Sequence, residues 1–169
     1  MQLKEISDGK YRYCLYSDKF DHNGKTLIVI QKNPSLADCN RSDPTAGKII
    51  KWAKERKFSK IIFLNLFSYR SPKTDIFGIY DYETLIGSKT DIYLKEILSE
   101  NPNATIVAAW GNNPKSFSKD EYDKRVKEVV DIIGKDRLQI VGKITKKGYP
   151  RHGLSWNEKP ELEKYSKFL

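Results

Sequence analysis

The chain has few of the residues that bind metals or form disulfides. Its 169 residues include two cysteines, Cys14 and Cys39, and two histidines, His22 and His152. A closed zinc site would need all four, and their spacing matches no zinc motif. We therefore expect no metal. We also expect both cysteines to be reduced, as is usual in the cytoplasm.

Long apolar runs are absent as well. No stretch approaches the roughly 18 apolar residues of a membrane span. The first residues, MQLKEISDGKYRY, lack the apolar centre of a signal peptide. These absences predict no membrane partner and a cytoplasmic location. With 38% hydrophobic and 31% charged residues, the chain is expected to form one soluble domain over residues 1–169. Its oligomeric state stays open.

The common nucleotide-binding and hydrolytic motifs are also missing. There is no P-loop, GxGxxG, HExxH or GxSxG pattern, and we expect no cofactor. The charge is unbalanced, because 31 Lys and Arg residues face 22 Asp and Glu residues, for a net charge of +9. This excess favours a polyanionic partner such as DNA or RNA. The alternative is an ordinary basic surface without such a partner.

Short apolar segments alternate with amphipathic ones along the chain. The pattern predicts strands at 25–31, 60–66, 104–110 and 137–141, and helices at 45–57, 80–100 and 119–133. An aromatic strand at 11–16, followed by an Asn23-Gly24 turn, predicts an antiparallel hairpin before them. The expected fold is α/β: a three-layer α/β/α sandwich with a mainly parallel four-stranded sheet and an N-terminal antiparallel hairpin strand.

The loop after the first apolar strand contains Asn33, Pro34 and Ser35. Ligands of parallel sheets bind at the carboxyl ends of the strands, so the loops after the strands should form one site. The Asn33 amide can hold a water or read the edge of a base. The other interpretation is a turn that ends the strand. Further along this loop, Arg41 is a candidate phosphate ligand, and Cys39 leaves a thiol nucleophile open.

The next two loops supply polar and aromatic candidates. Asn65 ends the second strand and either contacts a ligand or ties the loops together. Phe67, Tyr69 and Arg70 follow it, and an aromatic beside an arginine suits stacking on a base and contact with a phosphate. Surface packing is the alternative. Trp110 and Gly111 end the third strand, where Trp110 either walls a pocket or packs in the core.

The last loop is basic. It carries four positive charges and no acidic residue, at Lys143, Lys146, Lys147 and Arg151. Such a loop can lie along a phosphate backbone or be solvated. His152 follows at once, in a turn framed by proline and glycine, and can donate to a developing anion or act as an acid or base.

These short motifs occur in a defined order. From Tyr11 to Leu154 the chain reads YRY, NPSLAD, DPT, NLFSYR, AAWG and GYPRHG. The set resembles a bacterial and phage family of unknown function, domain-of-unknown-function family 1643. The chain departs from it at Gly153, where the family usually has proline. It also departs after DPT, where Ala46-Gly47-Lys48 stands and a basic residue is usual nearby.

The layout is also similar, more distantly, to the uracil-DNA glycosylase superfamily. In its mismatch-specific branch an Asn-Pro pair ends the first strand, and that Asn positions the attacking water. Here Asn33 and Pro34 match, while the flanking glycines do not. In several branches a His in the last motif bonds the departing base, and His152 takes that place. The resemblance implies Asn33 and His152 as catalytic residues, with Phe67, Tyr69 or Trp110 against a flipped base.

Two kinds of function therefore stand from the sequence. The first is a hydrolase that cleaves an N-glycosidic bond in DNA or in a free nucleotide. The second is a protein that binds a nucleotide and does no chemistry, such as a phage protein that captures a nucleotide signal. The positive charge favours DNA, whereas the lack of an acidic residue in the first motif favours the binder.

Overall fold

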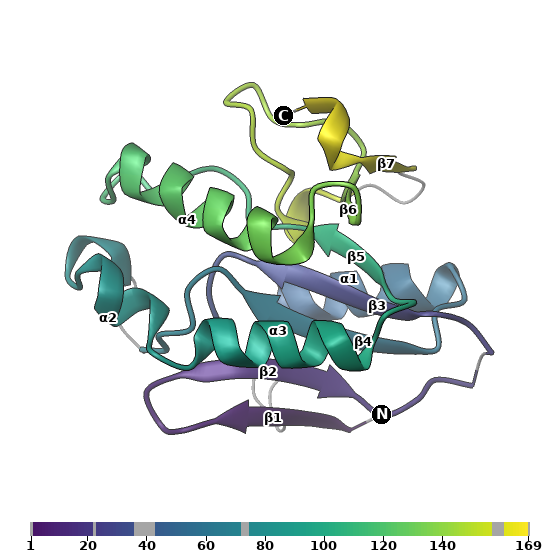
Figure 1. Ribbon diagram of the computed structural model, residues 1–169. Helices are drawn as coiled ribbons and strands as arrows, with labels where there is room; N and C mark the ends of the chain where they lie inside the picture. The colour runs from purple at the N-terminus through teal and green to yellow at the C-terminus, as the bar shows by residue number, and fades with distance from the viewer. Residues whose placement is uncertain (1, 22, 36–42, 72–74, 157–160, 169) are drawn as a thin grey trace.

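In the part of the chain that the structure describes, seven strands form one mixed sheet (Figure 1). The computed structural model describes residues 2–21, 23–35, 43–71, 75–156 and 161–168. The strands are β1 (Leu3–Ser7), β2 (Arg12–Ser17), β3 (Thr26–Gln31), β4 (Lys60–Asn65), β5 (Thr105–Ala108), β6 (Leu138–Val141) and β7 (Leu162–Lys164). Their order across the sheet is β1-β2-β4-β3-β5-β6-β7.

The centre of the sheet is parallel and its edges are antiparallel. Strand β3 pairs in parallel with β4 and β5, and β5 pairs in parallel with β6. On one side β2 runs antiparallel to β4 and β1, and on the other β7 runs antiparallel to β6. The expected α/β class is confirmed. The expected four-stranded sheet is wrong in extent, because those four strands are only the middle of seven.

Helices cover both faces of the sheet. The α-helices are α1 (Pro44–Glu55), α2 (Tyr82–Ile86), α3 (Thr90–Glu100) and α4 (Lys119–Ile133), and the 3₁₀ turns are η1 (Ile76–Gly78), η2 (Gly153–Ser155) and η3 (Tyr165–Phe168). Figure 1 shows α3 and α4 on one face and α1 on the other. Among the described residues, no helix combines the length and apolar character needed to cross a membrane.

The apolar runs are explained by this burial on both sides. Successive side chains of a strand point to opposite faces, so a strand with helices on both faces is apolar throughout. In β3, Ile28 and Ile30 pack into the core on the α3 and α4 side, and Leu27 and Val29 into the core on the α1 side. All four side chains are fully buried.

The predicted hairpin at Asn23-Gly24 does not form. Strand β2 pairs with β1 and β4, and the segment holding Gly24 leads instead into the parallel strand β3. A side chain at Gly24 would place its Cβ 2.0 Å from the Lys57 carbonyl oxygen, just after α1. This glycine is therefore explained by close backbone approach and not by a hairpin turn.

The single helix expected over 80–100 is divided. It contains α2 and α3, separated at Gly87, whose φ is +80°. A Cβ at Gly87 would lie 2.6 Å from the Tyr11 ring. A left-handed backbone pressed against an aromatic ring suits glycine alone, so the helix stops there.

The strand order locates the crevice of the sheet. From β3 the chain crosses through α1 to β4 on one side, whereas β5 crosses through α4 to β6 on the other side. The adjacent strands β3 and β5 thus flank the switch point, where open α/β sheets bind ligands beyond the carboxyl ends of the strands.

Candidate functional site

The loop after β3 enters this crevice with Asn33. Its side-chain amide donates from Nδ2 to the Pro34 carbonyl oxygen at 3.2 Å. Among the described residues, nothing donates to Asn33 Oδ1. The bond from Nδ2 holds the amide group in place, so Oδ1 is free to accept from a ligand or a water. Pro34 is buried, and Ser35 Oγ accepts from Nη2 of the buried Arg12 at 3.4 Å.

Lys32 stands one residue before Asn33 and is a candidate that the sequence analysis missed. Its backbone carbonyl accepts from Phe67 N at 2.9 Å, which prolongs the β3–β4 pairing. Its Nζ lies 5.9 Å from the centroid of the Tyr122 ring. No carboxylate in the described part of the chain pairs with it, and burial lowers its pKa to about 8. A cation is thus held at the crevice without an anion to balance it.

His152 lies at the same edge of the sheet, and its imidazole ring is neutral. Its Nδ1 accepts from Leu154 N at 3.3 Å, which leaves the ring proton on Nε2. Burial lowers the His152 pKa, the positive charge of Lys32 lowers it further, and the Asp43 carboxylate opposes both. Near neutral pH, His152 therefore presents an uncharged Nε2–H donor.

Asp43 supplies a carboxylate close to His152. An Asp directly before a proline is typical of a helix start, and Asp43 Oδ1 accepts from Ala46 N at 2.6 Å at the start of α1. Its other oxygen, Oδ2, is buried and has no hydrogen-bond partner among the described residues. A buried carboxylate oxygen without a donor is available to a water or a ligand.

Gly111 brings the loop after β5 against His152. Its φ is +69°, and a Cβ there would lie 3.1 Å from the His152 Cβ. Tyr122 of α4 fixes this loop by donating its hydroxyl to the Gly111 carbonyl at 3.0 Å. The neighbouring Trp110 is fully buried and packs edge-on against Tyr165, so it belongs to the core and is not a pocket wall.

Gly153 explains one departure from the family pattern. A Cβ at this position would lie 2.4 Å from the Ile49 Cδ1, on α1. Lys48 of the same helix donates to the Leu154 carbonyl at 2.6 Å. The His152 turn therefore packs directly on α1, closely enough that Ile49 would have to move to admit a side chain at Gly153.

A cavity of about 230 Å³ opens beside Asn33. Its polar lining comes from Lys32, Asn33, Tyr69, Ser71 and Asp75, and Pro34 and Phe77 are among its apolar walls. The Tyr69 ring packs against Tyr80 with centroids 4.4 Å apart. Asp75 is held by the Ser116 hydroxyl at 2.6 Å and by Gly78 N at 3.1 Å. The cavity has room for one flat ring system with a polar edge.

Three other predicted residues lie apart from this cavity. Phe67 is fully buried among Phe77, Phe117 and Tyr122, so it serves the core and not a base-stacking wall. Arg70 donates to both oxygens of Glu5, at 3.3 and 3.2 Å, so its predicted phosphate contact would require that pair to break. Asn65 is buried, donates to the Arg12 carbonyl at 3.5 Å, and has no partner for Oδ1 within the described ranges.

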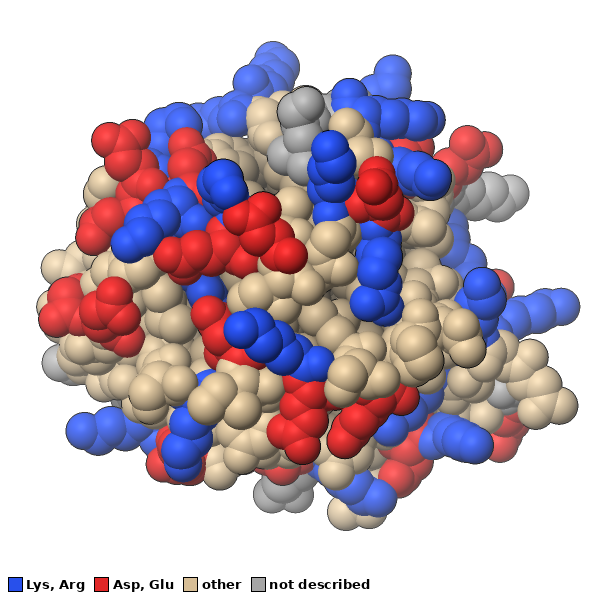
Figure 2. Space-filling view, in the orientation of Figure 1, with Lys and Arg blue, Asp and Glu red and all other residues tan. Residues whose placement is uncertain are grey.

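The basic loop is exposed, as a phosphate-binding loop must be. Lys143, Lys146, Lys147 and Arg151 are all exposed, and Arg151 Nε donates to the Lys143 carbonyl at 3.0 Å. Figure 2 shows acidic and basic side chains interspersed on the face that carries α3 and α4. The net charge of +9 is therefore not gathered on that face. Arg41 and Cys39 lie outside the described residues.

Two site residues escaped the sequence analysis for different reasons. Asp43 was visible in the DPT motif, but capping accounted for it completely. Lys32 carried the stronger signal, because a lysine directly after a strand buried on both faces is at risk of desolvation.

Among the described residues, no group of three metal-ligating side chains occurs.

Comparison with known proteins gives one result. Neither the search of the curated proteins nor that of the solved structures finds a match. A family model matches residues 12–154, which include β2 and the His152 turn. The chain belongs to the family described as Protein of unknown function (DUF1643).

Proposed function

We propose that the protein binds a nucleobase in the cavity beside Asn33 and hydrolyses the N-glycosidic bond that joins the base to its sugar. The observation that carries this proposal is the position of Lys32, which lines the cavity together with Asn33 and whose positive charge acts on His152. Asn33 Oδ1 is an anchored, unused acceptor, and His152 is a neutral donor kept uncharged by its burial and by Lys32. Hydrolysis of this bond needs a held water and a donor for the departing base.

The proposed reaction assigns one task to each residue. A water held by Asn33 Oδ1 attacks the anomeric carbon, and the bond from that carbon to the base nitrogen breaks. The bonding electrons leave on the base, where the His152 Nε2–H and the Lys32 charge stabilise them. The water gives up its proton to solvent, and Tyr69, which lines the cavity, stacks on the base. The distant similarity to uracil-DNA glycosylases supports the same two principal roles.

A polymeric substrate is the preferred form of this proposal. DNA is favoured by the exposed basic loop of residues 143–151, which precedes His152 directly. A base in a duplex would have to rotate out of the stack to enter the cavity.

A nucleotide-binding protein without catalysis is the second candidate. It is favoured by Asp75, a carboxylate that lines the cavity and is already bonded to Ser116 and Gly78. Both bonds are made to Oδ1 and fix the carboxylate, which can then accept from the edge of a bound base without taking part in any chemistry.

A product assay distinguishes these functions. The purified protein is incubated with single-stranded and duplex DNA carrying uracil, thymine mismatches or modified pyrimidines, and abasic sites are detected by alkaline cleavage. Free nucleotides are incubated in parallel and analysed by chromatography. We expect abasic sites, and we expect Asn33→Ala or His152→Asn to lower their rate about 100-fold or more. His152→Asn is the matched variant, because its side-chain oxygen can still accept from Leu154 N while the Nε2 donor is lost.

Two results would contradict the proposal. Unchanged rates in both variants would remove Asn33 and His152 from the chemistry. Absence of product from every substrate, together with a nucleotide that stabilises the protein against heat, would establish the binding function instead. Lys95→Gln, an exposed change on α3, is the control for handling losses.

A further inference from the structure

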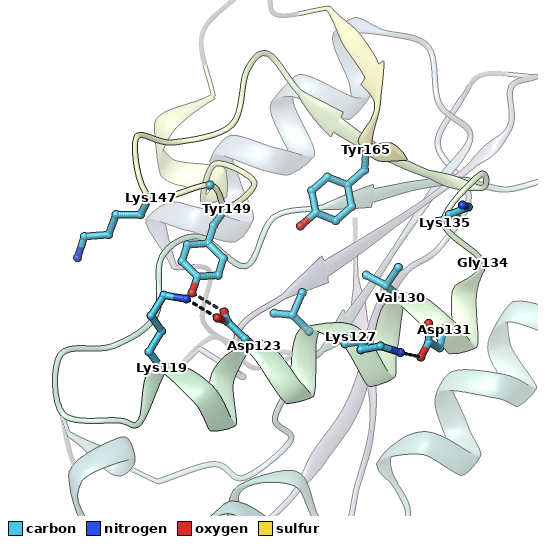
Figure 3. Close-up of a pocket in the computed structure, with 12 residues that line it drawn as sticks. Lys119, Asp123, Lys127, Val130, Asp131, Gly134, Lys135, Lys147, Tyr149 and Tyr165 are labelled. Carbon is cyan, nitrogen blue, oxygen red and sulfur yellow. Dashed lines mark hydrogen bonds and ion pairs between the residues drawn. The ribbon is translucent and has the colours of Figure 1, made fainter. Parts of the chain in front are cut away.

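A second, larger cavity lies between α4 and the C-terminal part of the chain (Figure 3). Its volume is about 600 Å³. Val126 and Val130 of α4 form one wall, and the rings of Tyr149 and Tyr165 form the other. The interior is therefore apolar and partly aromatic, and it is separate from the cavity beside Asn33, with which it shares no lining residue.

Tyr165 places an unused polar group in this cavity. Its side chain is only 3% exposed, and Figure 3 shows its hydroxyl directed into the cavity. No described residue hydrogen-bonds that hydroxyl, whereas the Tyr149 hydroxyl donates to Asp123 at 2.5 Å. Burial raises the pKa of Tyr165 to about 12, so the hydroxyl keeps its proton. The hydroxyl therefore reaches the cavity space and is available to donate to or accept from a ligand.

The rim of the cavity carries an excess of positive charge. Lys119 pairs with Asp123, and Lys127 pairs with Asp131 at 2.6 Å. The other two lysines of the rim, Lys135 and Lys147, have no carboxylate partner among the described residues. Both acidic residues of the rim are thus already neutralised, and two cations remain for an anion.

We propose that this cavity is a binding site for a small organic anion with a flat, apolar ring system. The rings of Tyr149 and Tyr165 pack on the apolar body, and the Tyr165 hydroxyl bonds a polar atom of the ligand. Lys135 and Lys147, which lie at opposite ends of the cavity (Figure 3), make its surroundings positive and so favour an anion. This proposal does not depend on the proposed function.

The cavity is also connected to the candidate site by packing. Tyr149 contacts Tyr122 edge-on, with ring centroids 5.4 Å apart, and Tyr122 holds the Gly111 carbonyl beside His152. Tyr149 and Tyr122 therefore join the wall of this cavity to the Gly111 loop by direct packing.

Two fluorescent dyes test the site. The first, 8-anilinonaphthalene-1-sulfonate, has a flat apolar body and one negative charge. The second, N-phenyl-1-naphthylamine, has nearly the same body and no charge. We expect saturable binding of one sulfonate dye per folded chain. The double variant Lys135→Gln/Lys147→Gln should lower the affinity for the sulfonate dye about fivefold. It should change the affinity for the neutral dye by less than about twofold.

Variants within the cavity complete the test. Val130→Phe fills the cavity and should weaken both dyes about tenfold or more. Tyr165→Phe removes only the hydroxyl and should weaken the sulfonate dye about two- to fivefold. Asn33→Ala, in the other cavity, should change neither affinity. The thermal midpoint of each variant shows that the chain is folded during the measurement.

Three results would overturn the proposal. The first is no saturable binding of the sulfonate dye up to about 1 mM. The second is an equal loss for both dyes in the lysine double variant, which would remove the role of charge. The third is unchanged affinity in folded Val130→Phe, which would place the dyes elsewhere on the molecule.

Discussion

Lys32 and His152 illustrate how two residues far apart in sequence determine each other's charge. Both are withdrawn from water at the carboxyl edge of the sheet, and the positive charge of Lys32 lowers the His152 pKa. Asp43 acts in the opposite sense. The neutral imidazole that the proposed chemistry requires therefore depends on burial and on the Lys32 charge, which together outweigh the opposing charge of Asp43.

The His152 titration provides a direct test of this coupling. Removing a nearby positive charge favours the imidazolium, so Lys32→Met should raise the His152 pKa. Asp43→Asn removes the opposing charge while retaining a capping oxygen for Ala46 N, and it should lower the same pKa. The measurement is an NMR titration of the imidazole Hε1 signals, assigned with His152→Asn. Shifts of the same sign in both variants would contradict the arrangement.

Lys32 should also reduce the stability of the protein. Its pKa is about 8 in the folded chain, below the ordinary value of 10.5, so the unfolded chain binds more protons between these values. The penalty is therefore complete below about pH 8 and disappears as the pH rises toward 10.5. We expect Lys32→Met to raise the unfolding free energy by about 1–3 kcal/mol at pH 7, and by much less at pH 10.

Urea denaturation at the two pH values measures this difference. Lys95→Met, on the exposed side of α3, is the control and should change stability by less than about 0.5 kcal/mol. A gain from Lys32→Met that is equal at pH 7 and pH 10 would mean that packing and not charge is responsible. A residue that costs stability and lines a cavity is typical of a functional site.

At the scale of elements, α3 and α4 are joined by a buried cation. Arg125 of α4 is fully buried and donates to the Leu66 carbonyl at 2.7 Å, to Asp91 at 2.6 Å and to Glu128 at 3.3 Å. These bonds connect α4 both to α3 and to the chain leaving β4. Because the site residues around Tyr122 depend on the position of α4, this connection also supports the site.

Replacing Arg125 should therefore lower the stability of the protein strongly. Arg125→Ala leaves Asp91 and the Leu66 carbonyl without their donor and opens a cavity between the helices, and we expect a loss of about 3–5 kcal/mol in the free energy of unfolding. Lys127→Ala breaks the exposed pair with Asp131 on the same helix and should cost less than about 1 kcal/mol. Urea denaturation compares the two variants, and similar losses in both would contradict the role given to Arg125.

The elements that the sequence predicted well are those with a strong local signal. Helix α4 occupies the expected 119–133, because its apolar residues repeat at helical spacing and Ser118 caps it. Strands β1 and β7 were missed because each is an edge strand with little apolar content. Their strand character comes from pairing with β2 and β6, which no local pattern records.

The candidate site was predictable only in outline. Asn33 and Gly111 follow strands, so the topology alone brings them to one edge, and the structure places Gly111 against His152. The state of Lys32 was not predictable, because its desolvation depends on residues such as Tyr122 that are distant in sequence. The ion pair that occupies Arg70 was not predictable either, because its partner, Glu5, is distant in sequence.

At the scale of the whole molecule, much of the basic charge is locally neutralised. The face with α3 and α4 carries acidic and basic side chains together (Figure 2), and α4 alone holds pairs such as Lys119 with Asp123 and Lys127 with Asp131. The basic loop of residues 143–151 differs, because it contains no acidic residue. If DNA binds, we expect this loop to make the phosphate contacts.

The salt dependence of DNA binding counts those contacts. Four cations on phosphates predict a slope of about −3 to −4 in a plot of log K against log salt concentration, at about −0.9 for each contact on a duplex. Lys146→Gln should make the slope less steep by about one contact, whereas Lys127→Gln, whose charge is already paired with Asp131, should leave it unchanged. The measurement is fluorescence anisotropy of a labelled duplex in increasing KCl. A slope that responds equally to both variants would show that binding follows the total charge of the molecule. A slope that responds to Lys146→Gln alone would indicate that the phosphate backbone contacts the loop that precedes His152. Cleavage of a base from DNA by His152 requires the backbone to pass there.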